Sequence, residues 1–560
     1  MPPIPDALGP GRGETRPCSR QPRRGGPLRL GALLLGTATA VPLVVLFSAW
    51  ATPETEVWRH LAATVLPGLL RNTGALLLGV GAGTLALGCG LAWLTARCEF
   101  PGRRWLDWAL MLPLALPAYV LAFVTYGLFD TAGPVQRLLA HVPGAAKVSF
   151  EARGTGWVIA VLTLAFYPYV YLLARAAFLA IGRGTLEAAR LLGLGGWGTF
   201  FRVVLPTARP AIVAGVALAL METLADFGAV SVFNYDTFTT AIYKAWFGLF
   251  NLPAAAQLAS LLLLIVALAL VGERRLRGAA RFHETARGAP PPRIALAGWR
   301  GGLAATLAGL VVGLGIVLPM VQLVGWVAAS HDTGLDQRYW TLLARTLALG
   351  ASAALVTVAG ALVVGLARRQ LRDRASRVAV EVSALGYALP GSVLAVGVMM
   401  SFASLDNALN TLWRLLGGGR LGPVLGGSIA ALLLAYLVRF LAVANGPIGS
   451  ALERLRPSVV EAARTLGARG LDLTRRIYLP LLRPGLLTAA LLVLVEVMKE
   501  MPATLLLRPF GWDTLAVRIF EFTSEGEWQR AALPAVTLVL AGLGPVVWLA
   551  RRSAATPEST

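Results

Sequence analysis

The chain has 560 residues, of which 56% are hydrophobic and only 14% are charged, against roughly 25% charged residues in a typical soluble domain. This composition excludes an ordinary soluble protein and indicates an integral membrane protein. The net charge of +21 would suit a nucleic-acid-binding protein, but the basic residues gather in alternate loops between apolar runs, which is the pattern of membrane topology. We therefore expect no nucleic-acid partner.

Long uncharged runs identify the type of membrane structure. Residues 30–50 and 301–330 contain no Asp, Glu, Lys or Arg, and each run is as long as the ~20 residues that a helix needs to cross a bilayer. Neither run shows the alternating hydrophobicity of a membrane β-barrel. The expected fold class is therefore an all-α integral membrane protein.

Twelve membrane spans are predicted in chain order, in two sets of six. A basic segment at residues 1–27, which we expect to be a disordered tail, precedes the first set. The segment 273–300, with the sequence GAPPPR, is the expected linker between a first transmembrane domain (28–272) and a second (301–550), and a short tail (551–560) follows. The predicted spans are 28–50, 73–96, 106–129, 157–180, 211–232 and 253–272, then 301–328, 343–367, 378–404, 424–446, 485–507 and 531–550.

Loop charges predict the orientation of these spans. With an even number of spans, both tails and every second loop lie on one side, and the amino-terminal tail and these loops carry net charges between +2 and +5. The loops on the other side carry between −1 and +1. Because positive loops stay in the cytoplasm, we expect both termini to be cytoplasmic.

One stretch occurs twice at a constant offset. Residues 187–212 read EAARLLGLGGWGTFFRVVLPTARPAI, and residues 461–486 read EAARTLGARGLDLTRRIYLPLLRPGL, 274 positions later. ALPAYVLAF at 115–123 likewise returns as ALPGSVLAV at 388–396. The chain therefore consists of two parallel six-span repeats. Within each copy we expect a short helix, a turn at a glycine, and a second helix that re-enters the membrane.

The repeated stretch resembles the EAA loop of type I ABC-importer permeases. The resemblance implies a type I transmembrane core over about 67–272 and again over about 341–550, with EAA loops at 187–206 and 461–480. In that family the loop docks on an ATPase subunit and couples ATP hydrolysis to transport. The matching positions are Glu187, Ala188, Ala189, Gly193, Leu205 and Pro206 in the first half, and Glu461, Ala462, Ala463, Gly467, Leu479 and Pro480 in the second.

The chain has no ATP-binding motif of its own. A phosphate-binding loop needs a glycine directly before its lysine, and the three lysines here follow Ala146, Tyr243 and Met498. We therefore expect a transport subunit that is not itself an enzyme and binds no cofactor. Two EAA loops imply two separate ATPase subunits, which would use ATP and Mg²⁺.

Two pairs of carboxylates lie inside predicted spans. Glu222 and Asp226 are four residues apart, and Glu496 and Glu500 repeat this spacing 274 positions later. An ionisable group at mid-membrane usually faces a water-filled path, so we expect all four to line one translocation pathway for a cation. The alternative is that some of them neutralise interior basic groups, such as Lys499. No firm metal site is predicted, and transient cargo contact is expected at Asp226 and Glu500.

Flanking sequences narrow the resemblance to permeases of ferric-iron importers. ETLADFGAVSVFNYDTFTTAIYKAWF (222–247) and PATLLLRPFGWDTLA (502–516) carry this likeness. It implies a bacterial inner-membrane protein that receives Fe(III) from an extracytoplasmic binding protein. Import of thiamine or a polyamine by the same architecture stays open. An ion-coupled secondary transporter is the alternative from another class, but it would not need two EAA loops.

Overall fold

The computed structural model describes residues 26–51, 55–131, 133–141, 152–277, 293–330, 335–371 and 373–554. Nearly all of the predicted amino-terminal tail lies outside these residues. So do the central part of the predicted linker, 278–292, and the end of the predicted carboxy-terminal tail, 555–560.

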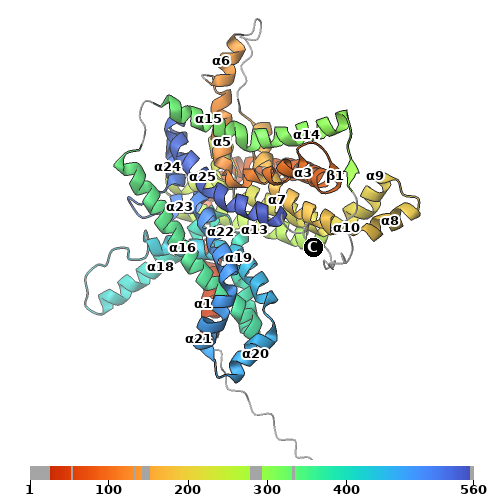
Figure 1. Ribbon diagram of the computed structural model, residues 1–560. Helices are drawn as coiled ribbons and strands as arrows, with labels where there is room; N and C mark the ends of the chain where they lie inside the picture. The colour runs from red at the N-terminus through yellow and green to blue at the C-terminus, as the bar shows by residue number, and fades with distance from the viewer. Residues whose placement is uncertain are drawn as a thin grey trace, which may run out of the picture.

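Helices make up almost all of the described structure (Figure 1), which confirms the predicted fold class. The one pair of strands within the described residues is a short parallel contact between β1 (Cys98–Glu99) and β2 (Ile294–Ala295). The helices of the first half are α1 (Gly26–Ser48), α2 (Thr55–His60), α3 (Leu66–Arg97), α4 (Arg103–Ala109), α5 (Ala118–Phe129), α6 (Pro134–Ala140), α7 (Thr155–Ala180), α8 (Arg183–Leu191), α9 (Gly196–Thr199), α10 (Leu205–Ala225), α11 (Gly228–Val232), α12 (Phe238–Tyr243) and α13 (Leu252–Arg277).

The second half contains a corresponding set. Its helices are α14 (Trp299–Val312), α15 (Leu318–Ala329), α16 (Gln337–Gln370), α17 (Arg374–Ser383), α18 (Gly391–Leu415), α19 (Ile429–Arg454), α20 (Pro457–Thr465), α21 (Gly470–Leu473), α22 (Leu479–Lys499), α23 (Pro502–Leu507), α24 (Leu515–Ser524) and α25 (Trp528–Ala554).

Membrane-spanning segments account for most of these helices. Ten helical segments among the described residues are long and apolar enough to cross a membrane. An eleventh is the bent pair that contains α4 and α5, whose two parts meet at 93°. Helix α25 occupies the twelfth predicted span. The bend follows from Pro113 and Pro117, because a proline supplies no backbone N–H to the helix.

The repeat is visible in the bounds of the elements. Helix α7 begins at Thr155 and α19 begins at Ile429, 274 residues later, and the same offset relates α8 to α20, α9 to α21 and α10 to α22. In Figure 1 the α8–α9 and α20–α21 segments each lie at an outer end of their own half. This common register allows side chains of the two halves to be compared position by position.

Four predicted spans are not single helices. The span 106–129 is the bent pair of α4 and α5, the span 378–404 is divided between α17 and α18, and two more spans break near their carboxyl ends. The prediction of continuous helices over 211–232 and 485–507 is wrong, because α10 ends at Ala225 and α22 ends at Lys499. A short new helix then begins in each half, α11 at Gly228 and α23 at Pro502. Hydrophobicity could not reveal these breaks, since the residues on both sides of them are apolar.

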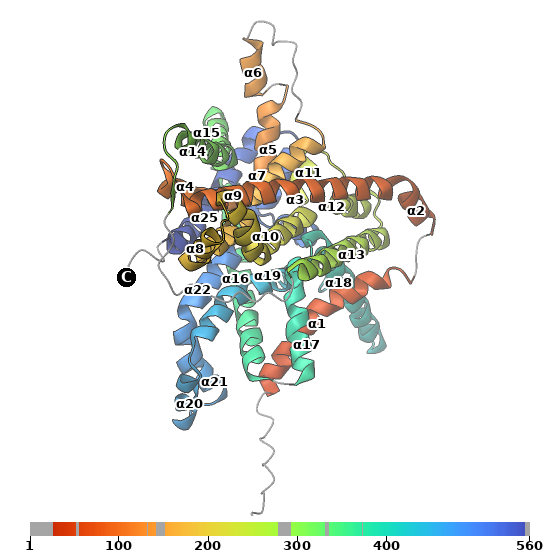
Figure 2. The same cartoon turned by 90° about the vertical axis from the view of Figure 1, so that its right-hand side faces the viewer.

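The first membrane span of each half packs against helices of the other half. Helix α1 packs on α16, α17 and α18 of the second half, and α14 and α15 contact α4 and α5 of the first. Figure 2 shows α1 running alongside α17. At their crossing, a methyl group added to Gly36 would lie 2.8 Å from the Cα of Ala379. A glycine is therefore required for this approach of one backbone to the other.

We expect Gly36→Ala to destabilise the protein by about 1–3 kcal/mol, because the added methyl meets backbone and forces α1 away from α17. Thermal unfolding of the purified protein in detergent measures the effect. Gly68→Ala in α3 is the matched control, since a methyl group there meets no atom within 4 Å. Equal unfolding temperatures for the two variants would contradict the requirement for glycine at this crossing.

Candidate functional site

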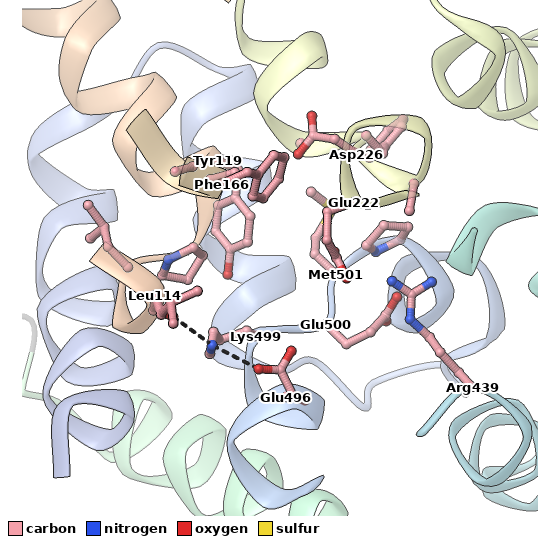
Figure 3. Close-up of a pocket in the computed structure, with 18 of the residues that line it drawn as sticks. Leu114, Tyr119, Phe166, Glu222, Asp226, Arg439, Glu496, Lys499, Glu500 and Met501 are labelled. Atoms are coloured by element: carbon pink, nitrogen blue, oxygen red, sulfur yellow. Dashed lines mark hydrogen bonds and ion pairs between the residues drawn. The ribbon is translucent and has the colours of Figure 1, made fainter. Parts of the chain in front are cut away.

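A cavity of about 120 Å³ lies between the two halves (Figure 3). Its walls come from the two helix breaks described above, together with residues before and within α5 and residues of α7 and α19. The prolines Pro117 and Pro502, each beside a helix start, line it. The site is therefore built where helices stop and restart, which exposes backbone polar groups toward the cavity.

All four predicted carboxylates line this one cavity. Glu222 lies on the last turn of α10 and Glu496 on the last turn of α22, while Asp226 and Glu500 occupy the two breaks. Among the described residues, no three His, Cys, Asp or Glu side chains are grouped closely enough to hold a metal ion. The carboxylates are thus distributed around the walls rather than gathered at one point.

Asp226 and Glu500 also hold the helices that follow them. Oδ1 of Asp226 accepts a hydrogen bond from the Val230 N–H at 3.1 Å, at the start of α11. The Glu500 carboxylate accepts bonds from the Ala503 N–H at 3.1 Å and from both the N–H and the hydroxyl of Thr504 at 3.0 Å. Each carboxylate caps a short helix, where it satisfies N–H groups that have no partner within the helix.

Glu496 forms an ion pair inside the cavity. The Lys499 ammonium lies 3.2 Å from Oε1 of Glu496 and donates a second hydrogen bond, at 3.1 Å, to the carbonyl of Leu114 in the first half (Figure 3). Lys499 therefore joins the two halves across the cavity. At this position the structure shows the alternative in which a carboxylate neutralises an interior basic group.

Arg439 is a site residue that the sequence analysis missed. It lies on α19, lines the cavity and donates to the carbonyl of Leu389 at 3.2 Å. A methyl group on Gly391 would lie 2.5 Å from Oε1 of Glu500 and 2.8 Å from Nη1 of Arg439, so these two side chains flank the same glycine. The available signal was a single charge within the apolar run 429–446, which is costly in a membrane unless it has a function or a partner.

The EAA loops have the same geometry in both halves. Helix α8 ends in a turn at Gly193 (φ +79°), where the Leu194 N–H donates to the Ala189 carbonyl at 3.1 Å. Helix α20 is followed by a turn at Gly467 (φ +92°), where the Ala468 N–H donates to the Ala463 carbonyl at 3.0 Å. Both turns need a left-handed residue, which glycine adopts without strain. The structure thus contains the predicted order of short helix, glycine turn and second helix.

The other EAA-loop residues divide into exposed and buried positions. Leu191, the last residue of α8, is 88% exposed, and Leu466, directly after α20, is 89% exposed. The third residue of each EAA triplet is buried. Glu187 is exposed and pairs with Arg183 at 2.6 Å. The exposed positions are Glu187, Ala188, Pro206, Glu461, Ala462, Leu479 and Pro480, the buried ones are Ala189 and Ala463, and Leu205 is half-buried.

Comparison with known proteins finds one family twice in the chain. The model of the family described as "Binding-protein-dependent transport system inner membrane component" matches residues 85–277 and 357–543. The Fe(3+)-transport system permease protein FbpB 2 of Haemophilus influenzae is 28% identical over 528 residues, which cover 93% of this chain and 97% of that protein.

Shorter relatives match about a third of the chain. The molybdenum transport system permease protein ModB of Escherichia coli is 33% identical over 191 residues, 34% of this chain and 82% of its own length. The sulfate transport system permease protein CysT of the same organism is 33% identical over 178 residues, 31% of this chain and 62% of its own length.

Proposed function

This chain belongs to the family of binding-protein-dependent transport system inner membrane components, and from that premise we propose that it is the fused permease of an ATP-driven importer for Fe(III). The cargo would be delivered by an extracytoplasmic binding protein. The two matched segments would form the cores of two transmembrane domains, 28–272 and 301–550, within one polypeptide.

The observation that carries the iron assignment is the full-length similarity to a relative named as an Fe(3+)-transport permease. The chemistry of the cavity supports the assignment. Its four carboxylates, against the two cationic side chains Arg439 and Lys499, leave an excess of negative charge among the lining residues. Carboxylate oxygens are hard ligands that suit a small, highly charged cation.

ATP hydrolysis would take place on two partner ATPase subunits, one on each EAA loop. The exposed faces of α8 and α20, with leucines that no part of the described chain covers, would be their docking surfaces. Closure of the ATPase pair would draw the two loops together and rock the halves about the cavity. Because α10 and α22 run from the loops to the carboxylates, this movement would reach the cavity directly.

The orientation follows from the loop charges. Both EAA loops belong to the positively charged set of segments, so we place them, and both termini, in the cytoplasm. The cavity would then receive cargo from the opposite face of the inner membrane, and the surrounding lipid would contact the outer faces of the spans. The protein itself would need no bound cofactor.

The proposed function is tested by ATP hydrolysis of the reconstituted complex with a panel of loaded binding proteins. We expect the Fe(III)-loaded binding protein to stimulate hydrolysis by about tenfold, and the same protein without iron to stimulate it much less. Thiamine-loaded and polyamine-loaded binding proteins are the comparison. Stimulation by one of these and not by the iron-loaded protein would refute the iron assignment, and transport without any ATPase subunit would refute the importer class.

A further inference from the structure

The cavity has the same carboxylates in both halves but different cations. At the 274-residue offset, Glu222 corresponds to Glu496 and Asp226 to Glu500. Arg439 and Lys499, however, correspond to Ala165 and Ala225, and all four of these residues line the cavity. The two walls are therefore matched in negative charge, while both cationic lining residues come from the second half.

The carboxylates of the second half are engaged by their own wall. Glu496 pairs with Lys499 at 3.2 Å. Glu500 is only 6% exposed, accepts three hydrogen bonds from the start of α23 and lies beside Arg439 across Gly391. An arriving cation would have to displace these partners before it could bind. Lys499 and Arg439 are thus counter-charges that the chain supplies for its own carboxylates.

The first-half wall presents a different set of oxygens. The cap of Asp226 consists of backbone N–H groups of α11, with the Val230 N–H 3.1 Å from Oδ1, and the residue corresponding to Lys499 beside it is Ala225. Tyr119, on α5, also lines the cavity, and its side chain is buried with 7% of its surface exposed. Its hydroxyl has no hydrogen-bond partner among the described residues. A buried hydroxyl without a partner is costly, and a bound ligand in the cavity would remove that cost.

We propose that the first-half wall, formed by Asp226, Glu222 and Tyr119, binds the cargo, and that Lys499 and Arg439 exclude the second-half carboxylates from this role. The ligand class is a hard cation that prefers oxygen donors. For the identity of the cargo this inference rests on the proposed function. It adds that binding is one-sided within a cavity whose carboxylates are symmetric.

Binding of Tb³⁺ to the purified full-length chain in detergent tests this assignment. Tb³⁺ is a hard trivalent cation, and its emission is sensitised by a nearby tyrosine. We expect saturable emission from the wild type, and at least roughly tenfold weaker binding for Asp226→Asn and for Glu222→Gln. Asn at 226 keeps an oxygen that can cap α11. Tyr119→Phe should reduce both affinity and sensitised emission.

The second-half variants are the matched controls. The double variant Glu496→Gln with Lys499→Met leaves the net charge of the cavity unchanged, and we expect its affinity to stay within about twofold of wild type. Ala225→Lys copies the lysine of the second half onto the first and should weaken Tb³⁺ binding by at least about tenfold. Equal losses from both walls, no effect of Ala225→Lys, or no saturable binding by the wild type would each overturn the proposal.

Uptake of Fe(III) by the reconstituted complex separates this inference from the proposed function. Tb³⁺ binding that follows the expected pattern, without uptake of Fe(III), would refute the iron assignment. It would still support cation binding by the first-half wall. Fe(III) uptake together with Tb³⁺ binding that depends equally on Asp226 and on Glu496 with Lys499 would refute binding by the first-half wall alone. The proposed function as an Fe(III) importer would then still stand.

Discussion

Replacing Gly193 and Gly467 together by valine should reduce transport by the assembled complex roughly tenfold or more, since each left-handed β-branched residue costs at least ~1–2 kcal/mol. Both glycines have positive φ, and a methyl group added at either meets no atom within 4 Å. The change therefore acts on the backbone turn alone. Its effect is to redirect α8 and α20 relative to the helices that lead to the cavity.

Transport and ATP hydrolysis should be measured on the same preparation. The turn variant should insert in the membrane and let the ATPase subunits hydrolyse ATP, but hydrolysis should no longer depend on the loaded binding protein. Gly184→Val is the control, because this glycine lies within α8, outside the left-handed region and without a neighbour within 4 Å. Full coupling in the double variant would show that the turns do not set the position of the EAA loops.

Replacing Glu500 by alanine should destabilise the protein by about 3 kcal/mol or more, since it leaves buried donors without a partner. The donors are the N–H groups of Ala503 and Thr504, whereas the Thr504 hydroxyl keeps its bond to the backbone carbonyl of residue 500. The positive charge of Arg439 would also lose its neighbour. The start of α23 should loosen, which thermal unfolding in detergent and hydrogen exchange of residues 502–507 would measure.

Glu500→Gln separates capping from charge, because it removes the charge and keeps one oxygen, which can still accept the two bonds from Thr504. We expect it to recover at least half of the lost stability. Glu525→Ala, an exposed glutamate just after α24, is the control and should change stability by less than about 0.5 kcal/mol. If Glu500→Ala were as stable as the control, the carboxylate would not be holding the helix break.

Hydrophobicity was sufficient to predict the all-α class, because it depends on composition over about twenty residues. The repeat could be predicted because 187–212 and 461–486 match at a constant offset of 274 residues. The helix breaks at Asp226 and Glu500 were missed for a local reason. Their acidic side chains were interpreted as pathway groups on a continuous helix, although an acidic residue shortly before a new helix start is also a capping signal. Pro502, at the first position of α23, was the clearest available indication.

The candidate site was predictable only in part. The four carboxylates could be found because charges within apolar spans are rare. The cationic side chains near them could not be predicted, since Lys499 contacts a carbonyl 385 residues away and Arg439 lies on another helix, on the far side of Gly391 from Glu500. Such contacts depend on how α19, α22 and the turn before α5 pack together, and no local pattern records that packing.

The shared register of α7–α11 and α19–α23 has a consequence for how such a protein can change. In a transporter made of two identical chains, one codon alters both sides of the pathway at once. Here a mutation at Ala225 leaves Lys499 unchanged, so natural selection can act on each wall of the cavity separately. Covalent fusion thus allows division of labour between duplicated halves, in which one wall can adapt to a new cargo while the other conserves the architecture.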